Sequence, residues 1–340
     1  MTEEQTTQLF QVFDQSAQIL QQALETSYLD AFIETADNMI DGNQVRVENG
    51  IPNEQQVQTI TELYQQVNYH DLDANMIRKA IQMVMIKAIK VDQIQAIHQI
   101  TPDTIAYTMG YLAIRLVNKQ SVVKILDPAV GSANLLTAVM NQLQQEAHEK
   151  VSGIGIDNDD SLISVASISA QMQGLNLELF HQDALDELPT TPVDLVVSDL
   201  PVGYYPVDER AQHFATRSDE GHSYVHHLLI EQAVNYLVPG GFGVFLVPSG
   251  LFQSPETKGL LKWMQDEVYL QGILNLPGEL FQNEAVQKAI MIVQKHGDGT
   301  QQAGQVMLGE FPSFKDPEAF QKFLAEIVEW EEQDLLNKHQ

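Results

Sequence analysis

The segment VVKILDPAVGSAN, residues 122–134, decides the fold. Its apolar run VVKIL is the right length for a buried strand, and it ends in a turn that leads into a helical pattern. Gly131 lets a ligand approach the backbone, and the N-terminus of the following helix offers amide groups that lack intrahelical partners. A plain tight turn is the alternative explanation. The loop lacks both the G-x-G-x-x-G pattern of dinucleotide folds and the Lys-Ser/Thr of phosphate-binding loops.

Short apolar runs of the same kind recur downstream, with helical patterns between most of them. The further predicted strands are SGIGI (152–156), LELF (177–180), DLVVS (194–198), GFGVFLV (241–247), LQGILNL (270–276) and AIMIVQ (289–294). This alternation predicts an α/β fold, a doubly wound, mostly parallel Rossmann-like sheet with helices on both faces. Ligands of such sheets lie beyond the carboxyl ends of the strands, so functional residues are expected directly after each strand.

The flanking regions divide the chain into three parts. Residues 1–95 carry apolar residues at spacings of three and four, which predicts an N-terminal helical domain. Residues 96–300 form the α/β domain, and residues 301–340 add a C-terminal extension with a short strand and a helix. At the start of the α/β domain, Thr101 is expected to cap a helix that has Pro102 at its first position.

Composition restricts the environment and the partners. The 340 residues are 44% hydrophobic, contain no cysteine, and show no apolar stretch or leader typical of membrane or secreted proteins. We therefore expect a cytoplasmic protein with no membrane association. Asp and Glu number 46 against 18 Lys and Arg, a net charge of −28 that repels free nucleic acid, although acidity can also serve solubility alone.

One basic stretch departs from this acidity. It contains Arg78, Lys79, Lys87 and Lys90, all within one predicted helix. It is the one credible surface for nucleic acid, and a solvated helix face is the alternative. Nucleic-acid binding is thus expected to be weak without a basic partner, and a protein substrate or partner subunit is an open alternative.

Acidic residues follow the second and third strands. Asp157-Asn158 is placed to accept hydrogen bonds from a ribose diol, and Asp183-Ala184 to accept from an exocyclic amine of adenine. Each aspartate alone could instead cap a helix. Together with the Gly131 loop, and with no Lys or Arg in these turns, they outline a nucleoside site without provision for phosphates. This pattern favours S-adenosylmethionine over NAD or ATP as cofactor.

The fourth strand ends in SDLPVGYYP (198–206), and here the chain resembles a known family. It is similar to class I S-adenosylmethionine-dependent methyltransferases, in particular N6-adenine DNA methyltransferases arranged like type I modification subunits. That family has an Asn/Asp-Pro-Pro-aromatic motif at this strand end. The segments HQITPD (98–103), VPGGFGVFLVPSGLF (238–252) and ILNLPGELFQNEAVQKAIMIV (273–293) resemble its other elements, so the resemblance covers roughly residues 70–295.

The resemblance implies roles for individual residues. Asp199 takes the polar position of the motif, which accepts hydrogen bonds from the target amine, and Pro201 takes the second proline. The expected catalytic residues are Asp199, Pro201 and Tyr204. The expected cofactor-binding residues are Thr101, Pro102, Asp127, Pro128, Ala129, Gly131, Asn134, Asp157, Asn158, Asp183, Ala184 and Asp199.

Three positions depart from the family pattern. Ala133 stands where a second loop glycine is usual, Leu200 replaces the first proline, and Val202 replaces the aromatic residue that stacks on a flipped-out base. Tyr204 or Tyr205 could supply that aromatic surface, or could simply pack in the loop. No separate target-recognition domain is apparent after residue 300.

These observations predict an N-methyltransferase that acts on adenine N6 in DNA or RNA. One alternative is methylation of a protein glutamine amide, and another is a non-catalytic or partner-dependent cofactor-binding protein. His222, His226 and His227 lie close in sequence, and the first two could share a helix face. We predict no metal site there, because no firm carboxylate partner is evident.

Overall fold

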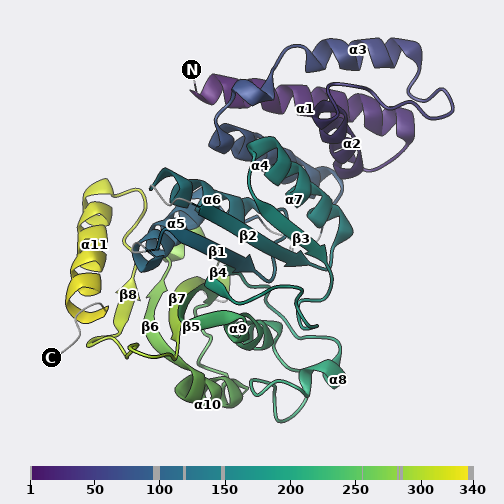
Figure 1. Ribbon diagram of the computed structural model, residues 1–340. Helices are drawn as coiled ribbons and strands as arrows, with labels where there is room; N and C mark the ends of the chain where they lie inside the picture. The colour runs from purple at the N-terminus through teal and green to yellow at the C-terminus, as the bar shows by residue number, and fades with distance from the viewer. Residues whose placement is uncertain are drawn as a thin grey trace.

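The chain folds into a helical domain stacked on an α/β domain (Figure 1). The computed structural model describes residues 2–94, 100–117, 120–146, 150–254, 256–281, 283 and 286–335. Among these residues no helix is long and apolar enough to span a bilayer.

An eight-stranded sheet forms the centre of the described α/β domain, in the order β3-β2-β1-β4-β5-β7-β6-β8. Its strands are β1 (Val122–Asp127), β2 (Lys150–Asp157), β3 (Leu177–His181), β4 (Val193–Asp199), β5 (Leu237–Pro248), β6 (Val268–Asn275), β7 (Lys288–Lys295) and β8 (Met307–Glu310). Only β7 runs antiparallel to its neighbours. The predicted doubly wound, mostly parallel sheet is confirmed, and the strand order reverses between β1 and β4, where such sheets bind ligands.

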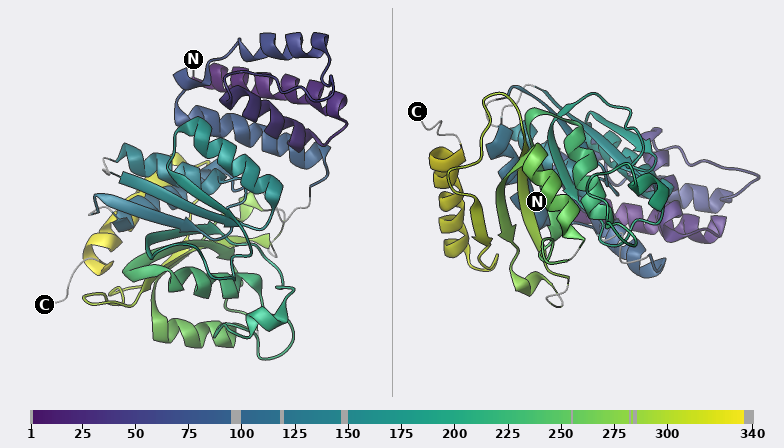
Figure 2. Two further views of the ribbon diagram at one scale, coloured as in Figure 1. Left: turned by 45° about the vertical axis from the view of Figure 1, so that its right-hand side comes forward. Right: turned by 90° about the horizontal axis from the view of Figure 1, so that it is seen from below.

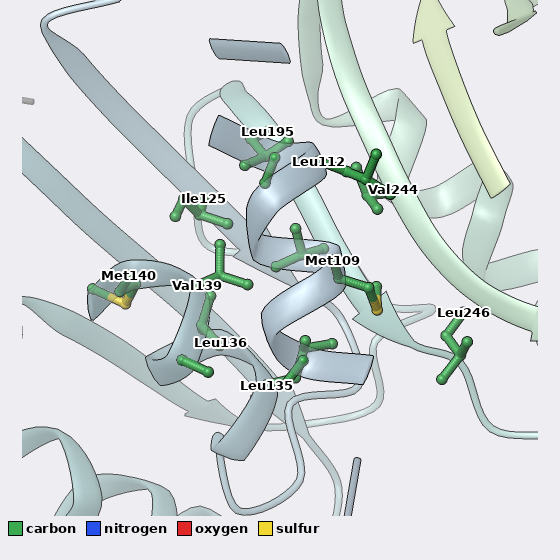
Figure 3. Close-up of a cluster of buried hydrophobic side chains, with 14 of the residues drawn as sticks. Met109, Leu112, Ile125, Leu135, Leu136, Val139, Met140, Leu195, Val244 and Leu246 are labelled. Atoms are coloured by element: carbon green, nitrogen blue, oxygen red, sulfur yellow. The ribbon is translucent and has the colours of Figure 1, made fainter. Parts of the chain in front are cut away.

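Helices cover both faces of the sheet (Figure 1). One face carries α5 (Asp103–Val117), α6 (Asn134–Gln145) and α7 (Asp160–Gln173), and the other carries α9 (Val225–Asn235) and α10 (Thr257–Glu267). Figure 3 shows Met109 and Leu112 of α5 and Val139 of α6 facing apolar side chains from the sheet. Burial of these side chains fixes the sheet, and therefore the turns at its carboxyl edge.

The N-terminal helical domain is also confirmed. It contains α1 (Thr2–Leu24), α2 (Tyr28–Ile40), α3 (Glu54–Tyr64), the 3-10 turn η1 (Tyr69–Asp71) and α4 (Ala74–Val91). Its core incorporates Leu162, Val165, Ile168 and Met172 from α7, so the two domains share one apolar cluster. Figure 2 shows the helices of this domain beside the α/β domain, where α2 and α4 pack against α7 and α4 also contacts α6. The expected boundary at residues 95–96 touches residues outside the described ranges.

The C-terminal extension adds β8, α11 (Pro317–Trp330) and a π-helical turn (Glu331–Leu335). It contains the short strand and the helix that the sequence predicts. Strand β8 pairs in parallel with β6. The guanidinium of Arg115 in α5 forms an ion pair with the buried carboxylate of Glu331, which ties the extension to the α/β domain.

Candidate functional site

The loop after β1 has the backbone conformation that its sequence predicts for a ligand cradle. Gly131 has φ +52° and Ala133 has φ +61°, both in the left-handed region. Helix α6 then begins at Asn134, and no side chain caps its N-terminus. An ideal Cβ built on Gly131 meets nothing within 4 Å, so the loop borders open space. The first-turn amides of α6 therefore remain able to meet a polar ligand.

Asp127 closes β1 as a buried carboxyl group. Its Oδ1 accepts hydrogen bonds from Ala129 N (3.1 Å) and Ser198 Oγ (2.7 Å). Burial, together with the charges of Asp157 and Asp199, raises the pKa of Asp127 to about 7, although the two hydrogen bonds act to lower it. Asp127 therefore links β1 to β4 beneath the cradle. Pro128 beside it is buried, and Ala129 is partly buried.

Asp157 connects the first two turns of the sheet edge. Its Oδ2 accepts from Gly131 N at 2.8 Å, and its Oδ1 accepts from Asp159 N at 3.0 Å. The acidic side chain after β2 thus lies beside the loop after β1, as the strand order requires. Asn158 is exposed, and its carbonyl oxygen lies 3.1 Å from His181 Nε2.

The carboxylate of Asp183 accepts more hydrogen bonds within the protein than the sequence predicts. Its Oδ2 lies 2.6 Å from Tyr205 Oη and 2.7 Å from Arg210 Nη1, and its Oδ1 accepts from Leu185 N. The turns after the first three strands contain no Lys or Arg in sequence. The cation beside Asp183 is Arg210, which lies in the short helix α8 (Asp208–Ala211) that follows the motif loop. The neighbouring Ala184 is buried, and its carbonyl accepts from Gln232 Nε2.

Asp199 lies at the end of β4, with both carboxylate oxygens occupied. Oδ2 accepts from Thr101 Oγ1 at 2.9 Å, and Oδ1 accepts from the ammonium group of Lys288. The predicted N-cap at Thr101 is therefore wrong: α5 begins at Asp103, and the carbonyl of Pro102 accepts the first-turn bond from Ala106 N. The hydroxyl of Thr101 instead binds a charged acceptor, which makes a stronger hydrogen bond than a helix amide.

The motif loop is held by backbone pairing. Leu200, in place of the family's first proline, is fully buried and uses its amide to bond Leu246 O at 3.2 Å. Pro201 is partly buried, whereas Val202 is 52% exposed. Beyond it, Tyr204 pairs with Tyr224 in an isolated antiparallel bridge. Leucine therefore adds a hydrogen bond to β5 that a proline at this position could not make.

The two tyrosines of the motif have different surroundings. Tyr205 is buried and its hydroxyl binds Asp183, so its ring serves the loop core. Burial, followed by this hydrogen bond, raises the pKa of Tyr205 to about 12. Tyr204 is 55% exposed and stacks on Tyr224, with ring centroids 4.7 Å apart and planes 13° apart. Of these two tyrosines, Tyr204 is the one that remains available to an incoming ligand.

A cavity of about 520 Å³ opens beside the motif. The described residues that line it are polar and, apart from the histidines considered next, have no ionisable side chains. The lining residues are Val202, Tyr224, His226, His227, Pro248, Ser249, Gly250, Leu251, Gln253, Ser254, Asn275 and Gln287. This size suits a drug-sized or nucleobase-sized group. Through Val202 the cavity adjoins the loop that follows Asp199.

The histidines of this region are neutral or exposed. Burial lowers the pKa of His226 to about 3 and that of His227 to about 4, with the charges of His227 and Lys288 also acting on His226. His222 precedes α9 and contacts Asp208 Oδ1 at 2.9 Å, so it does not share a helix face with His226. Within the described ranges no three His, Asp or Glu side chains group as metal ligands.

The predicted basic surface on α4 does not form. Arg78 is buried, and Lys87 pairs with the carboxylate of Asp14. Lys79 and Lys90 are exposed. Burial of Arg78 follows from its acceptors in the α/β domain, which an isolated helix does not reveal.

The sequence did not indicate Ser198, Arg210, Tyr224 or Lys288 as site residues, and it assigned Arg78 to a nucleic-acid surface instead. Lys288 is the first residue of strand β7, whereas the sequence predicts functional residues directly after strands. Because β7 is antiparallel, its start lies at the same edge as the carboxyl ends of β4 and β5. Only knowledge of that strand direction would have brought Lys288 to Asp199. The neighbouring residues His98 and Gln99 of the predicted cofactor element lie outside the described ranges.

Comparison with known proteins gives two family matches. Residues 98–326 match the model of the N-6 DNA methylase family, and residues 7–89 match that of the YtxK N-terminal helical domain. Protein YtxK of Bacillus subtilis (strain 168) is 34% identical over 322 residues, covering 95% of this chain and 96% of that protein.

Solved structures give a consistent result. A Listeria monocytogenes protein, provisionally assigned as a class I S-adenosylmethionine-dependent methyltransferase, superimposes with a TM-score of 0.89 and 39% identity, over 96% of this chain and 99% of that one. A type I restriction-modification methyltransferase subunit from Streptococcus thermophilus superimposes with a TM-score of 0.64 and 17% identity. The match covers 81% of this chain and 62% of that one. At that identity the second likeness concerns the fold alone.

Proposed function

Because the chain belongs to the N-6 DNA methylase family, we propose that it methylates an exocyclic amine, with adenine N6 in nucleic acid as the first candidate. The family is one of S-adenosylmethionine-dependent methyltransferases, and S-adenosyl-L-methionine is its cofactor. The observation that carries the finer proposal is Asp199 at the end of β4: its carboxylate accepts from Thr101, and Val202, three residues further on, lines the cavity of about 520 Å³.

The residues at the carboxyl edge of the sheet fit this cofactor. The uncapped start of α6 supplies amide donors, and the open space at Gly131 accepts a bulky ligand. Asp157 supplies carboxylate acceptors of the kind that ribose hydroxyls need. We assign the adenine end to Asp183, whose acceptors are at present shared by Tyr205 and Arg210. In this assignment Asn134 faces the protein, since its amide binds Thr101 and Arg78.

The bound cofactor supplies an electrophilic methyl group on a sulfonium. The protein's part is to position and orient the acceptor. A carboxylate oxygen of Asp199 accepts a hydrogen bond from the acceptor amine, which directs the nitrogen lone pair away from Asp199. Thr101 fixes the other oxygen, so the carboxylate cannot rotate freely. Pro201 restricts the backbone of the loop, and Tyr204 lies exposed beyond it.

The cavity favours an uncharged, polar acceptor group. His226 and His227 are neutral at physiological pH and can exchange hydrogen bonds without adding charge. Val202 provides no ring for stacking, but Tyr224 brings an aromatic side chain into the lining. A nucleobase amine or a side-chain amide meets these requirements.

A nucleic-acid acceptor requires help from elsewhere. The chain carries a net charge of −28, and Arg78 and Lys87 of the basic stretch are already engaged within the fold. Solved structures with the same fold include a methyltransferase subunit of a type I restriction-modification system and a structure that describes complex assembly in such a system. We propose by analogy that a basic partner chain supplies the phosphate contacts.

A second candidate is a cofactor-binding protein that transfers no methyl group. The ion pair between Lys288 and Asp199 favours it, because the ammonium occupies a carboxylate oxygen that an acceptor amine would use. Val202 at the usual aromatic position favours it as well.

Incubation with labelled S-adenosylmethionine separates these candidates. The wild type, Asp199→Asn and the control Asp219→Asn, at an exposed position, are each offered duplex and single-stranded DNA, RNA and glutamine-containing peptides, with and without a cell extract that supplies partner chains. We expect label in adenine with the wild type and the control. With Asp199→Asn transfer should be lost while cofactor affinity is retained, the pattern of a group that acts on the transition state.

Other outcomes reject the proposal. Label in glutamine would identify the amide as the acceptor. Cofactor binding without transfer to any acceptor would support the second candidate. Absence of cofactor binding would refute both.

A further inference from the structure

Arg78 of the helical domain is bonded mainly to the α/β domain. Its side chain is 1% exposed. Nη1 donates to Asp103 Oδ1 and to Asn134 Oδ1, both at 2.8 Å, and Nη2 donates to Tyr107 Oη at 3.0 Å. Its one bond within α4, from Nε to Asn75 Oδ1, is longer, at 3.4 Å. The charge thus spans the junction between α4, α5 and α6.

The bonds continue from Arg78 to the motif. Asn134, the first residue of α6, accepts from Arg78 through Oδ1 and donates through Nδ2 to Thr101 O at 2.8 Å. Thr101 Oγ1 then donates to Asp199 Oδ2 at 2.9 Å. A single chain of hydrogen bonds therefore joins the helical domain, the cofactor loop and the motif.

The donor and the acceptor of each hydrogen bond in this series are fixed. Arg78 can only donate, so the oxygen of Asn134 must face it and the nitrogen must face Thr101. The carbonyl of Thr101 is thereby held, and its hydroxyl is directed to Asp199. Lysine could not replace this fork, because one ammonium lacks the planar array of donors that reaches three acceptors.

We propose that Arg78 is a positioning residue, through which the helical domain sets the cofactor loop and the carboxylate of Asp199. The expected effect on cofactor binding rests on the proposed function. The expected effect on the conformation of the loop does not. A helical domain that acts only as a support would need no buried charge directed at the loop, since apolar contacts with α7 already join the domains.

Two measurements on the full chain test the inference. Hydrogen exchange without cofactor compares the wild type with Arg78→Lys, Thr101→Val and the control Lys79→Gln, the exposed neighbour on the same helix. We expect Arg78→Lys to speed exchange at residues 129–136 and at the amide of Leu200, which bonds Leu246. Thr101→Val should affect the Leu200 region but not α4, and Lys79→Gln should affect neither.

Calorimetry with S-adenosylmethionine supplies the second readout. Arg78→Lys should weaken binding roughly tenfold, and the pair Arg78→Met and Asn134→Leu should be non-additive. Faster exchange confined to α4 and α5, with unchanged affinity, would overturn the inference and reduce Arg78 to a structural tie. If the wild type binds no cofactor, the proposed function fails, and the exchange data still decide whether Arg78 positions the loop.

Discussion

The ammonium group of Lys288 forms an ion pair with the carboxylate of Asp199 at the start of the motif. The two side chains are 26% and 18% exposed, so solvent screens the pair only in part. The pair arises because β7 runs against β5 and starts where β4 ends. Any cation that binds beside Asp199 meets the charge of Lys288 as well.

Lys288→Gln should therefore change the selectivity for the charged cofactor. Removing a positive charge near Asp199 should favour S-adenosylmethionine, a sulfonium, over the neutral product S-adenosylhomocysteine by roughly three- to tenfold. Calorimetry with both ligands gives the ratio. Lys262→Gln, on an exposed part of α10, is the control and should leave the ratio unchanged. An unchanged ratio in Lys288→Gln would place the sulfonium away from Asp199.

Asp157→Ala should weaken S-adenosylmethionine binding at least roughly tenfold, about 1.4 kcal/mol. The substitution removes a proposed ribose acceptor and also the bond that holds Gly131 N at 2.8 Å. Asp160→Ala, three residues further on and largely exposed, is the matched control. Calorimetry is the measurement, and equal affinities for the two variants would contradict the ribose assignment.

Asp127→Asn should stabilise the protein above neutral pH. The folded pKa of about 7 exceeds the ordinary aspartate value of 3.8, so the folded state binds more protons between these values and its stability falls as pH rises through that window. Asparagine removes this loss, on the order of 4 kcal/mol at most, and its Oδ1 can still accept from Ala129 and Ser198.

Thermal melts of this variant and the wild type at pH 4 and pH 8 provide the check. The variant should melt higher at pH 8, with a smaller difference at pH 4. A difference independent of pH would mean that Asp127 is ionised in the folded state throughout this range.

Ala133→Gly should be tolerated, whereas Ala133→Val should be strongly destabilising. Residue 133 has φ +61°, which costs an L-residue about 1–2 kcal/mol and a glycine nothing. The greater entropy of glycine in the unfolded chain offsets part of this gain. Valine adds β-branching to the strained backbone and overfills a fully buried position. Urea unfolding gives the stabilities, and a stable Ala133→Val protein would show that the loop can change its conformation.

Binding of the isolated chain to duplex DNA should be weak and should fall steeply with salt. The double substitution of Lys87 and Lys90 by Gln should have little further effect, because Lys87 is paired with Asp14 and Lys90 contributes a single exposed charge. Fluorescence anisotropy with labelled duplex at two salt concentrations measures both effects. Tight, salt-insensitive binding would mean that another surface overcomes the net charge of −28.

The sequence by itself determined the layers of this protein and the edge at which its site lies. Runs such as VVKIL and DLVVS are recognisable because burial within a parallel sheet demands continuous apolar residues. Asp127, Asp157, Asp183 and Asp199 follow these strands, and parallel strands bring such positions to one edge. The left-handed loop could be anticipated at Gly131, since glycine is the residue that adopts this conformation most readily.

Only the tertiary structure decided which partners these side chains have. Lys288 reaches Asp199 because one strand is antiparallel, Arg78 is buried because α4 packs against α6, and Arg210 reaches Asp183 through the motif loop. The hydroxyl of Thr101 likewise binds Asp199 and does not cap the helix that follows it. Periodicity records the local geometry of a strand or helix, whereas a hydrogen bond between distant segments depends on strand order and direction. Those are set by the packing of the whole chain.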